Sequence, residues 1–240
     1  MLKIWTTGAS CSIRPLSDLA LSGPLADRWA SLRAALPATA RLLAVSKGHP
    51  AASIQALAQL GQRAFGESRL QEALPKQELL AELGLEWHFI GRLQSNKVRG
   101  VVRAFSVIHS LDSLALAERV SRIADEESVC PDVFLQVKLR PDPNKGGFAP
   151  EELLEAWSDL ASLPAMRIVG LMTMAPIDCQ PAERSALFSE CRALADQLGL
   201  PECSMGMSGD WREAVAAGGT WLRLGSVLFG PRTAASLAVG

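Results

Sequence analysis

Short apolar runs alternate along the chain with longer segments in which apolar residues recur at helical spacing. Residues 42–45 are all apolar, which is typical of a strand covered on both faces, as in a parallel sheet. Strands are predicted at residues 41–46, 63–66, 87–91, 106–110, 132–137, 167–172, 202–205 and 220–224. Helices are predicted between them, at residues 50–60, 68–83, 95–104, 112–127, 151–163, 181–198 and 210–217.

Eight strands that alternate with helices predict a single (β/α)8 TIM barrel, an α/β fold. A doubly wound parallel sheet is the alternative, because both folds share this order of elements. An extra N-terminal helix within residues 16–36 is expected to break at Gly23-Pro24, and the helix at 68–83 is expected to be interrupted near Pro75. We assign residues 16–232 to the barrel, residues 1–15 to a disordered extension and residues 233–240 to a loose tail.

Composition and charge exclude several classes of function. Of the 240 residues, 48% are hydrophobic, enough for a large core, and the formal net charge of −1 gives no basis for binding nucleic acid or an anionic membrane. The five cysteines and three histidines show no metal-binding spacing, and scattered cysteines are typical of reduced thiols. No apolar run reaches the length of a membrane span. We therefore expect a cytoplasmic protein that acts on a small molecule.

Candidate chemistry lies at the carboxyl ends of the predicted strands, where barrels bind their ligands. Lys47 follows the first strand, Ser208 follows the seventh, and Gly225 and Ser226 follow the eighth. Loops after the last two strands often hold phosphate in barrels. Each loop alone is more consistent with an ordinary turn, and their joint placement after the last two strands favours the phosphate site. Arg223 is the only charged residue of the eighth strand, so it points toward a partner in the barrel mouth or pairs with a buried carboxylate.

These residue types suit a phosphate-bearing aldehyde cofactor. A lysine amine condenses with an aldehyde as the free base, which requires a lowered pKa. A phosphate held at the far end of the ring keeps the aldehyde beside the amine. An arginine that faces a pyridine nitrogen keeps that nitrogen unprotonated, which weakens the ring as an electron sink. Lys47, Arg223 and the two loops therefore predict a restrained form of such a cofactor.

Six segments of the chain, in order, resemble the pyridoxal 5′-phosphate (PLP) homeostasis family, which is similar to the amino-terminal barrel of alanine racemase. They are LAVSK at 43–47, FGE at 65–67, WHFIGRLQSNK at 87–97, GLMTMAP at 170–176, SMGMS at 204–208 and RLGSVLFG at 223–230. The resemblance implies that Lys47 forms the internal aldimine with PLP and that Arg223 faces the pyridine nitrogen. It also implies that Ser208, Gly225 and Ser226 hold the phosphate.

Other residues of the matching segments carry no assigned step. His88, Gln94, Asn96 and Lys97 belong to the signature segment and are equally consistent with structural roles at the barrel rim. Two positions depart from the family pattern: Ser68 and Lys138 each stand where the family usually has asparagine. Lys138 thereby adds a second amine near the strand ends. Asp210 is expected to cap the helix that follows it.

The resemblance implies a carrier of PLP that takes part in cofactor homeostasis without strong catalysis. Alanine racemase uses a tyrosine from a second domain as an opposing base, and this chain contains no tyrosine. The alternative is a single-domain amino-acid racemase or related enzyme, with Lys138, a cysteine or water as the second base. We expect a monomer, with apo enzymes that use PLP as recipients of the cofactor.

Overall fold

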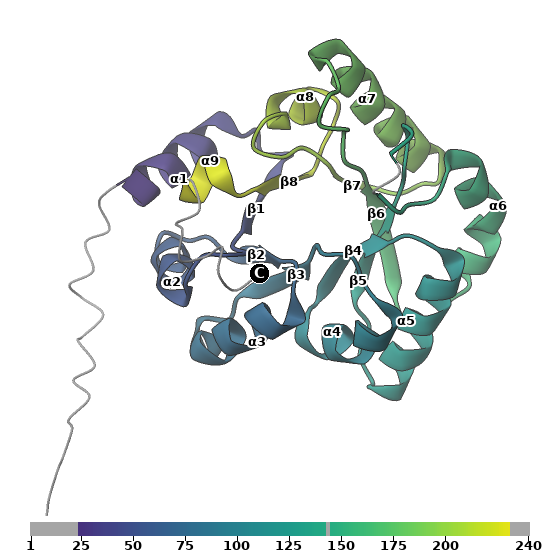
Figure 1. Cartoon of the computed structure of the whole chain (residues 1–240), viewed down its shortest axis with the longest axis horizontal. Helices are drawn as coiled ribbons and strands as arrows, with labels where there is room; N and C mark the ends of the chain where they lie inside the picture. Colours follow the sequence, from purple (N-terminus) through teal and green to yellow (C-terminus); the bar gives the residue numbers. More distant parts are fainter. Residues whose placement is uncertain (1–23, 143–144, 231–240) are drawn as a thin grey trace, which may run out of the picture.

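The chain folds into a closed barrel of eight parallel strands that follow one another in sequence order (Figure 1). The computed structural model describes residues 24–142 and 145–230. The strands are β1 (Arg41–Val45), β2 (Ala64–Glu67), β3 (Glu86–Phe89), β4 (Val107–Leu111), β5 (Asp132–Gln136), β6 (Arg167–Met172), β7 (Glu202–Ser204) and β8 (Trp221–Leu224). β1 pairs with β8 and so closes the ring. The TIM barrel is confirmed, and the doubly wound sheet is excluded because the sheet has no free edge.

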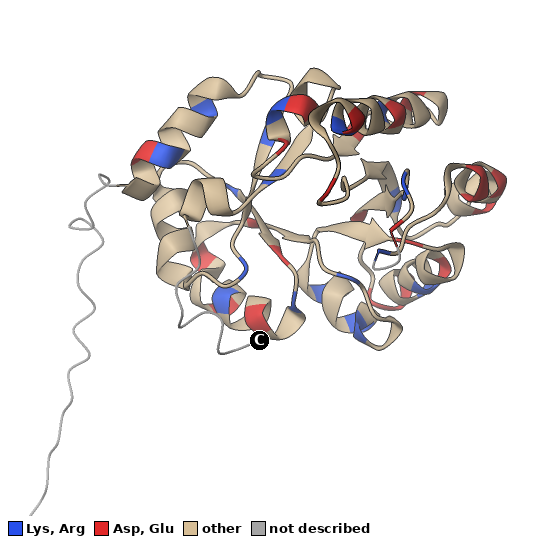
Figure 2. Ribbon diagram, turned by 45° about the horizontal axis from the view of Figure 1, so that its top comes forward, with Lys and Arg blue, Asp and Glu red and all other residues tan. Residues whose placement is uncertain are grey.

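Helices surround the barrel and cover the outer face of the sheet (Figure 1). They are α1 (Pro24–Ala35), α2 (Ala51–Gln59), α3 (Leu70–Leu79), α4 (Val98–Ala104), α5 (Leu114–Glu126), α6 (Pro150–Ala161), α7 (Pro181–Gln197), α8 (Trp211–Ala216) and α9 (Ser226–Phe229). Two 3₁₀ turns, η2 (Ala81–Leu83) and η3 (Ser95–Lys97), precede β3 and α4. Figure 2 shows both basic and acidic residues along these outer helices.

The two predicted helix breaks differ in what the structure describes. α1 begins at Pro24, the first described residue, so the expected break at Gly23-Pro24 stays a prediction. The predicted interruption near Pro75 is wrong, since α3 runs through this proline to Leu79. Tertiary packing of α3 outweighs the local cost of the proline there. The predicted N-terminal extension, the first piece of the helix before Pro24 and the loose tail lie outside the described residues.

Side chains alternate between two cores along each strand. An inner core fills the barrel and is formed by Leu43, Ala64, Val107, Phe134, Met172 and Trp221. A larger core between strands and helices takes the neighbouring positions, such as Leu42 and Ala44 on β1. This period of two explains why the strands read as continuously apolar, since both faces are covered.

Two features of other protein classes are missing from the described part of the chain. None of its helices is long and apolar enough to cross a membrane. Its histidine, cysteine, aspartate and glutamate side chains form no group of three or more that suits a metal ion.

Candidate functional site

Lys47 lies two residues beyond the end of β1, in the turn that leads into α2. The turn passes through Gly48, whose φ of 75° lies in the left-handed region that glycine adopts without a Cβ clash. The Lys47 residue is half-buried. The structure therefore places the predicted amine at the carboxyl face of the barrel.

A second lysine, Lys76 of α3, is buried beneath this turn. Its Nζ donates hydrogen bonds to Oε1 of Glu67 at 2.7 Å, to Oε1 of Glu72 at 2.7 Å and to the carbonyl oxygen of Ser46 at 3.0 Å. These three acceptors match the three hydrogens of an ammonium group. We refer to Ser46, Glu67, Glu72 and Lys76 as the buried lysine cluster.

The buried lysine cluster fixes the backbone on both sides of Lys47. Before it, the hydroxyl of Ser46 donates to Oε1 of Glu67 at 2.7 Å. After it, the amide of Gly48 donates to Oε1 of Glu72 at 2.5 Å. The backbone that carries the Lys47 side chain is thus held by charge-assisted hydrogen bonds, which are stronger than neutral ones.

The two carboxyl groups of the cluster differ in environment. Burial raises the pKa of Glu67, and the charge and hydrogen bond of Lys76 only partly oppose this rise. Oε2 of Glu67 is buried with no hydrogen-bond partner among the described residues, which adds to the cost of its charged form. Burial alone would also raise the pKa of Glu72, but hydrogen bonds from Lys76 and the Gly48 amide lower it below its usual value.

Arg223 points into the barrel, as predicted. Nη1 donates to the carbonyl oxygen of Ser204 at 2.6 Å and to its Oγ at 2.8 Å, and Nη2 donates to the carbonyl oxygen of Thr173 at 2.8 Å. No carboxylate of the described residues lies within ion-pair distance of it, so the alternative of a buried carboxylate partner is wrong. Burial lowers the pKa of Arg223 to about 10, while the charge of Asp210 opposes the shift. The guanidinium therefore stays protonated at neutral pH.

The loops after β7 and β8 meet at Ser208, whose Oγ accepts a hydrogen bond from the amide of Val227 at 3.3 Å. Gly225, the residue that follows β8, lies against β1, since a Cβ at this position would be 3.5 Å from both Cβ and the carbonyl oxygen of Val45. The ring of Phe229 stacks on His49 with a centroid distance of 4.5 Å. The structure therefore brings Ser208, Gly225 and the exposed Ser226 to the same rim as the turn after β1.

The SMGMS segment also has a structural requirement. Gly206 has a φ of 84°, and a Cβ there would be 2.6 Å from Cβ of Ala214, so no larger residue fits. Asp210 stands at the N-cap position of α8, as predicted, but its side chain makes no hydrogen bond to the first turn of the helix. Oδ1 of Asp210 instead accepts from the amide of Met207 at 2.5 Å, which closes the loop before the helix.

A continuous set of polar side chains crosses the barrel interior. Nδ1 of His109 lies 2.8 Å from Oγ of Ser204, and Nε2 of His109 lies 2.8 Å from Nδ1 of His88. Nε2 of His88 lies 2.9 Å from Oε1 of Glu86, the first residue of β3. Together with Arg223, these residues connect the two ends of the barrel. No role was predicted for His109, Ser204 or Glu86.

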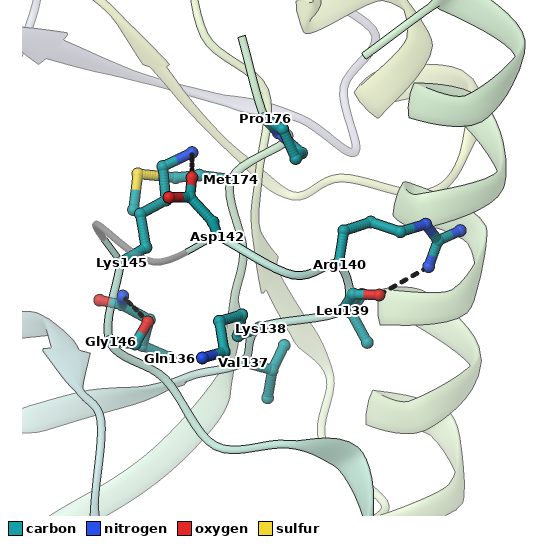
Figure 3. A pocket seen from close by; sticks show the side chains of 10 residues that line it. All are labelled: Gln136, Val137, Lys138, Leu139, Arg140, Asp142, Lys145, Gly146, Met174 and Pro176. Atoms are coloured by element: carbon teal, nitrogen blue, oxygen red, sulfur yellow. Dashed lines mark hydrogen bonds and ion pairs between the residues drawn. The ribbon is translucent and has the colours of Figure 1, made fainter. Parts of the chain in front are cut away.

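The two other lysines of interest lie on the opposite side of the mouth, after β5. Figure 3 shows Lys138 and Lys145 around a small pocket, which is lined by residues 136–140, Asp142, Lys145, Gly146, Met174 and Pro176. Nζ of Lys145 is 3.2 Å from Oδ2 of Asp142 and donates to the carbonyl oxygen of Ala175 at 3.2 Å. Lys138 is exposed.

The remaining residues of the signature segment lie at the rim. Gln94 and Asn96 are exposed, and Lys97 ends η3. Gly91 packs so closely against Ser68 that a Cβ would be 2.1 Å from the Ser68 carbonyl oxygen. The glycine therefore permits close approach of the loops after β2 and β3.

Comparison with known proteins identifies the family of this barrel. Residues 22–233 match the model of the alanine racemase N-terminal domain. A pyridoxal phosphate homeostasis protein of Synechocystis sp. is 48% identical over 211 residues, which cover 85% of this chain and 97% of that protein. The chain belongs to the pyridoxal phosphate homeostasis protein family. A further family member, from Pseudomonas aeruginosa, is 43% identical over 198 residues and covers 82% of this chain.

Solved structures agree with this family. PipY of Synechococcus elongatus, determined with PLP bound, is 49% identical, has a TM-score of 0.83, and covers 86% of this chain and 100% of its own. An alanine racemase of Clostridium difficile shares the fold at 15% identity and a TM-score of 0.70, with 56% of its chain covered. The homeostasis family thus corresponds in length to this barrel, whereas the racemase has a large additional part.

Proposed function

We propose that this chain binds PLP at the carboxyl face of the barrel and serves as a carrier in cofactor homeostasis. The observation that supports it most directly is the fixed position of Lys47, between two residues held by the buried lysine cluster. The family names of its relatives and the PLP in the PipY structure support the same cofactor. We further propose a cytoplasmic monomer whose recipients are apo enzymes that use PLP.

The donor groups at this face fit the three functional parts of PLP. The primary amine of Lys47 would hold the aldehyde. The hydroxyls of Ser208 and Ser226 and the Gly225 backbone suit the phosphate. The guanidinium of Arg223 suits the pyridine nitrogen, because it donates hydrogen bonds and accepts none.

When bound, PLP supplies an electrophilic aldehyde attached to a ring that withdraws electrons. Arg223 stays protonated at neutral pH, so it gives the ring nitrogen a hydrogen-bond donor that does not readily release its proton. Lys47 provides the covalent anchor, and the buried lysine cluster holds the backbone of that anchor in place. These roles retain the cofactor and do not by themselves move a proton on a substrate.

Chemical mapping tests the assignment of the anchor. Protein loaded with PLP is reduced with borohydride, digested and mapped, and we expect the label on Lys47. The Lys47→Ala variant should lose the visible absorbance of bound PLP, whereas Lys138→Ala, which removes an exposed lysine of the same rim, should retain it. Label found mainly on Lys138 or Lys145 would contradict the proposed anchor.

Isotope exchange tests the carrier role against the racemase alternative. The pure protein is incubated with a panel of L- and D-amino acids in deuterated water, and exchange at the α-carbon is followed by NMR. We expect no stereoinversion at useful turnover, because the sequence has no tyrosine to act as an opposing base. Rapid inversion of any of these amino acids would show that the chain is an enzyme.

A further inference from the structure

The polar side chains inside the barrel form a chain of hydrogen bonds that the binding of PLP does not by itself explain. It runs from Glu86 through His88, His109 and Ser204 to Arg223, with each link between side chains 2.8–2.9 Å long. Four of the five residues are buried, and Glu86 is partly exposed at the amino end of the barrel. This hydrogen-bond chain therefore joins the proposed cofactor face of the barrel to the opposite face.

The two charged ends fix the direction of every hydrogen bond in this chain. Arg223 can only donate, so Oγ of Ser204 accepts from it and is free to donate its own hydrogen to Nδ1 of His109. His109 then carries its proton on Nε2 and donates it to Nδ1 of His88. His88 likewise carries its proton on Nε2 and donates it to the Glu86 carboxylate.

The opposite direction fails at Glu86. If His109 donated from Nδ1 to Ser204, His88 would donate from Nδ1 to His109 and would present an unprotonated Nε2 to Glu86. A carboxylate only accepts hydrogen bonds, so two acceptors would then face each other at 2.9 Å. The hydrogen bond from His88 lowers the pKa of Glu86, which keeps this carboxyl ionised at neutral pH. Only the direction from Arg223 to Glu86 satisfies all five groups.

Packing holds both histidine rings in the planes that this chain requires. The ring of His109 stacks on Phe134 with a centroid distance of 4.3 Å and an interplanar angle of 17°. The ring of His88 lies against Trp221 with a centroid distance of 4.8 Å. Burial lowers the pKa of both histidines, more strongly for His109, so both rings are neutral at neutral pH.

We propose that Glu86, His88, His109 and Ser204 are positioning residues for Arg223 and orient its guanidinium toward the ring of the bound cofactor. The positioning role rests on the proposed function, because it requires that PLP binds. The direction of the hydrogen bonds does not depend on PLP binding. Arg223 retains its bonds to two backbone carbonyls without the chain. The chain adds a side-chain partner that is polarised by a carboxylate at its far end.

The direction of the chain is tested by NMR on the protein without PLP. The sequence has three histidines, so long-range ¹H–¹⁵N spectra of histidine-labelled protein contain three ring systems, which His88→Gln and His109→Gln variants assign. We expect both His88 and His109 as neutral rings protonated at Nε2 near pH 7.5. A proton on Nδ1 of either ring, or a charged ring, would overturn the proposed direction.

The link to Arg223 is tested by matched serine variants. Ser204→Ala removes the hydroxyl that joins Arg223 to the histidines, and Ser110→Ala removes a buried hydroxyl of β4 that has no hydrogen-bond partner among the described residues. We expect Ser204→Ala to shift the His109 nitrogen resonances, to move the absorption maximum of bound PLP and to weaken PLP binding by about tenfold. Ser110→Ala should change none of these, and Ser204→Thr, which keeps a hydroxyl, should restore them.

The outcomes separate this proposal from the proposed function. If PLP fails to bind the native protein, the proposed function is wrong. The NMR experiment on the histidine tautomers still tests the direction of the hydrogen bonds, because it uses the protein without PLP. If PLP binds normally and Ser204→Ala leaves both the histidine resonances and the PLP spectrum unchanged, the positioning role is wrong.

Discussion

Replacing Lys76 with methionine is expected to lower the free energy of unfolding by about 3–5 kcal/mol, because it leaves a buried carboxylate without its counter-charge. Lys76 is 8% exposed and supplies the ammonium that both Glu67 and Glu72 contact. Methionine has a similar length but donates no hydrogen bond, so the carbonyl oxygen of Ser46 loses one of its two donors and keeps the amide of His49. Urea unfolding followed by circular dichroism measures the loss.

Two further variants separate the charge effect from a simple packing defect. Lys138→Met removes an exposed lysine at the same rim, and its stability should stay within about 0.5 kcal/mol of the native protein. Adding Glu67→Gln to Lys76→Met should recover part of the stability, because the buried uncompensated charge is then gone. If Lys76→Met is no less stable than Lys138→Met, the buried lysine cluster does not hold the turn at Lys47.

The free energy of unfolding is expected to fall as the pH is lowered from about 7 to about 5. His88 and His109 have pKa values below the ordinary value of 6.5 in the folded protein, mainly because burial disfavours their charged forms. In the unfolded chain both take up a proton as the pH passes through 6.5, while in the folded barrel they take up that proton only at a lower pH. Each histidine therefore removes up to about 1.4 kcal/mol of stability per pH unit until the pH falls to its pKa in the folded protein.

Other groups have different signs or different pH windows. The lowered pKa of Glu86, caused first by its hydrogen bond from His88, affects stability only below about 4.5. The raised pKa of Glu67 acts in the opposite sense, because the folded protein then binds a proton at a higher pH than the unfolded chain does. Glu67 thus makes the total decrease smaller than the two histidines alone would give.

The His109→Gln variant isolates the histidine contribution. Glutamine is neutral throughout, so the variant should lose less stability between pH 7 and pH 5 than the native protein. Urea unfolding at pH 8, where histidine is neutral in both states, measures the part of the change that is independent of pH. Equal pH slopes for the native protein and His109→Gln would mean that His109 is not kept neutral by the fold.

Much of the barrel follows from local sequence. The apolar run at residues 42–45 and the similar runs in the other strands predict buried strands. The strand order of a barrel follows from their regular alternation with helices. Arg223 is predicted to point inward because it lies between apolar neighbours that cover the outer face of β8. The error at Pro75 arose because packing of α3 outweighs a local preference. Asp210 stands at the predicted N-cap position, but its carboxylate closes the preceding loop instead of binding the first turn of α8.

The sequence alone determined the fold, the lysine at the end of β1 and the loops that suit a phosphate, because periodicity and strand ends are local properties of the chain. Only the tertiary structure placed Lys76 under Lys47 and aligned His88, His109 and Ser204 inside the barrel. His109 and Ser204 are 95 residues apart and meet because both face the barrel interior from different strands. Such contacts depend on barrel closure and strand register, which no local pattern of polar residues specifies.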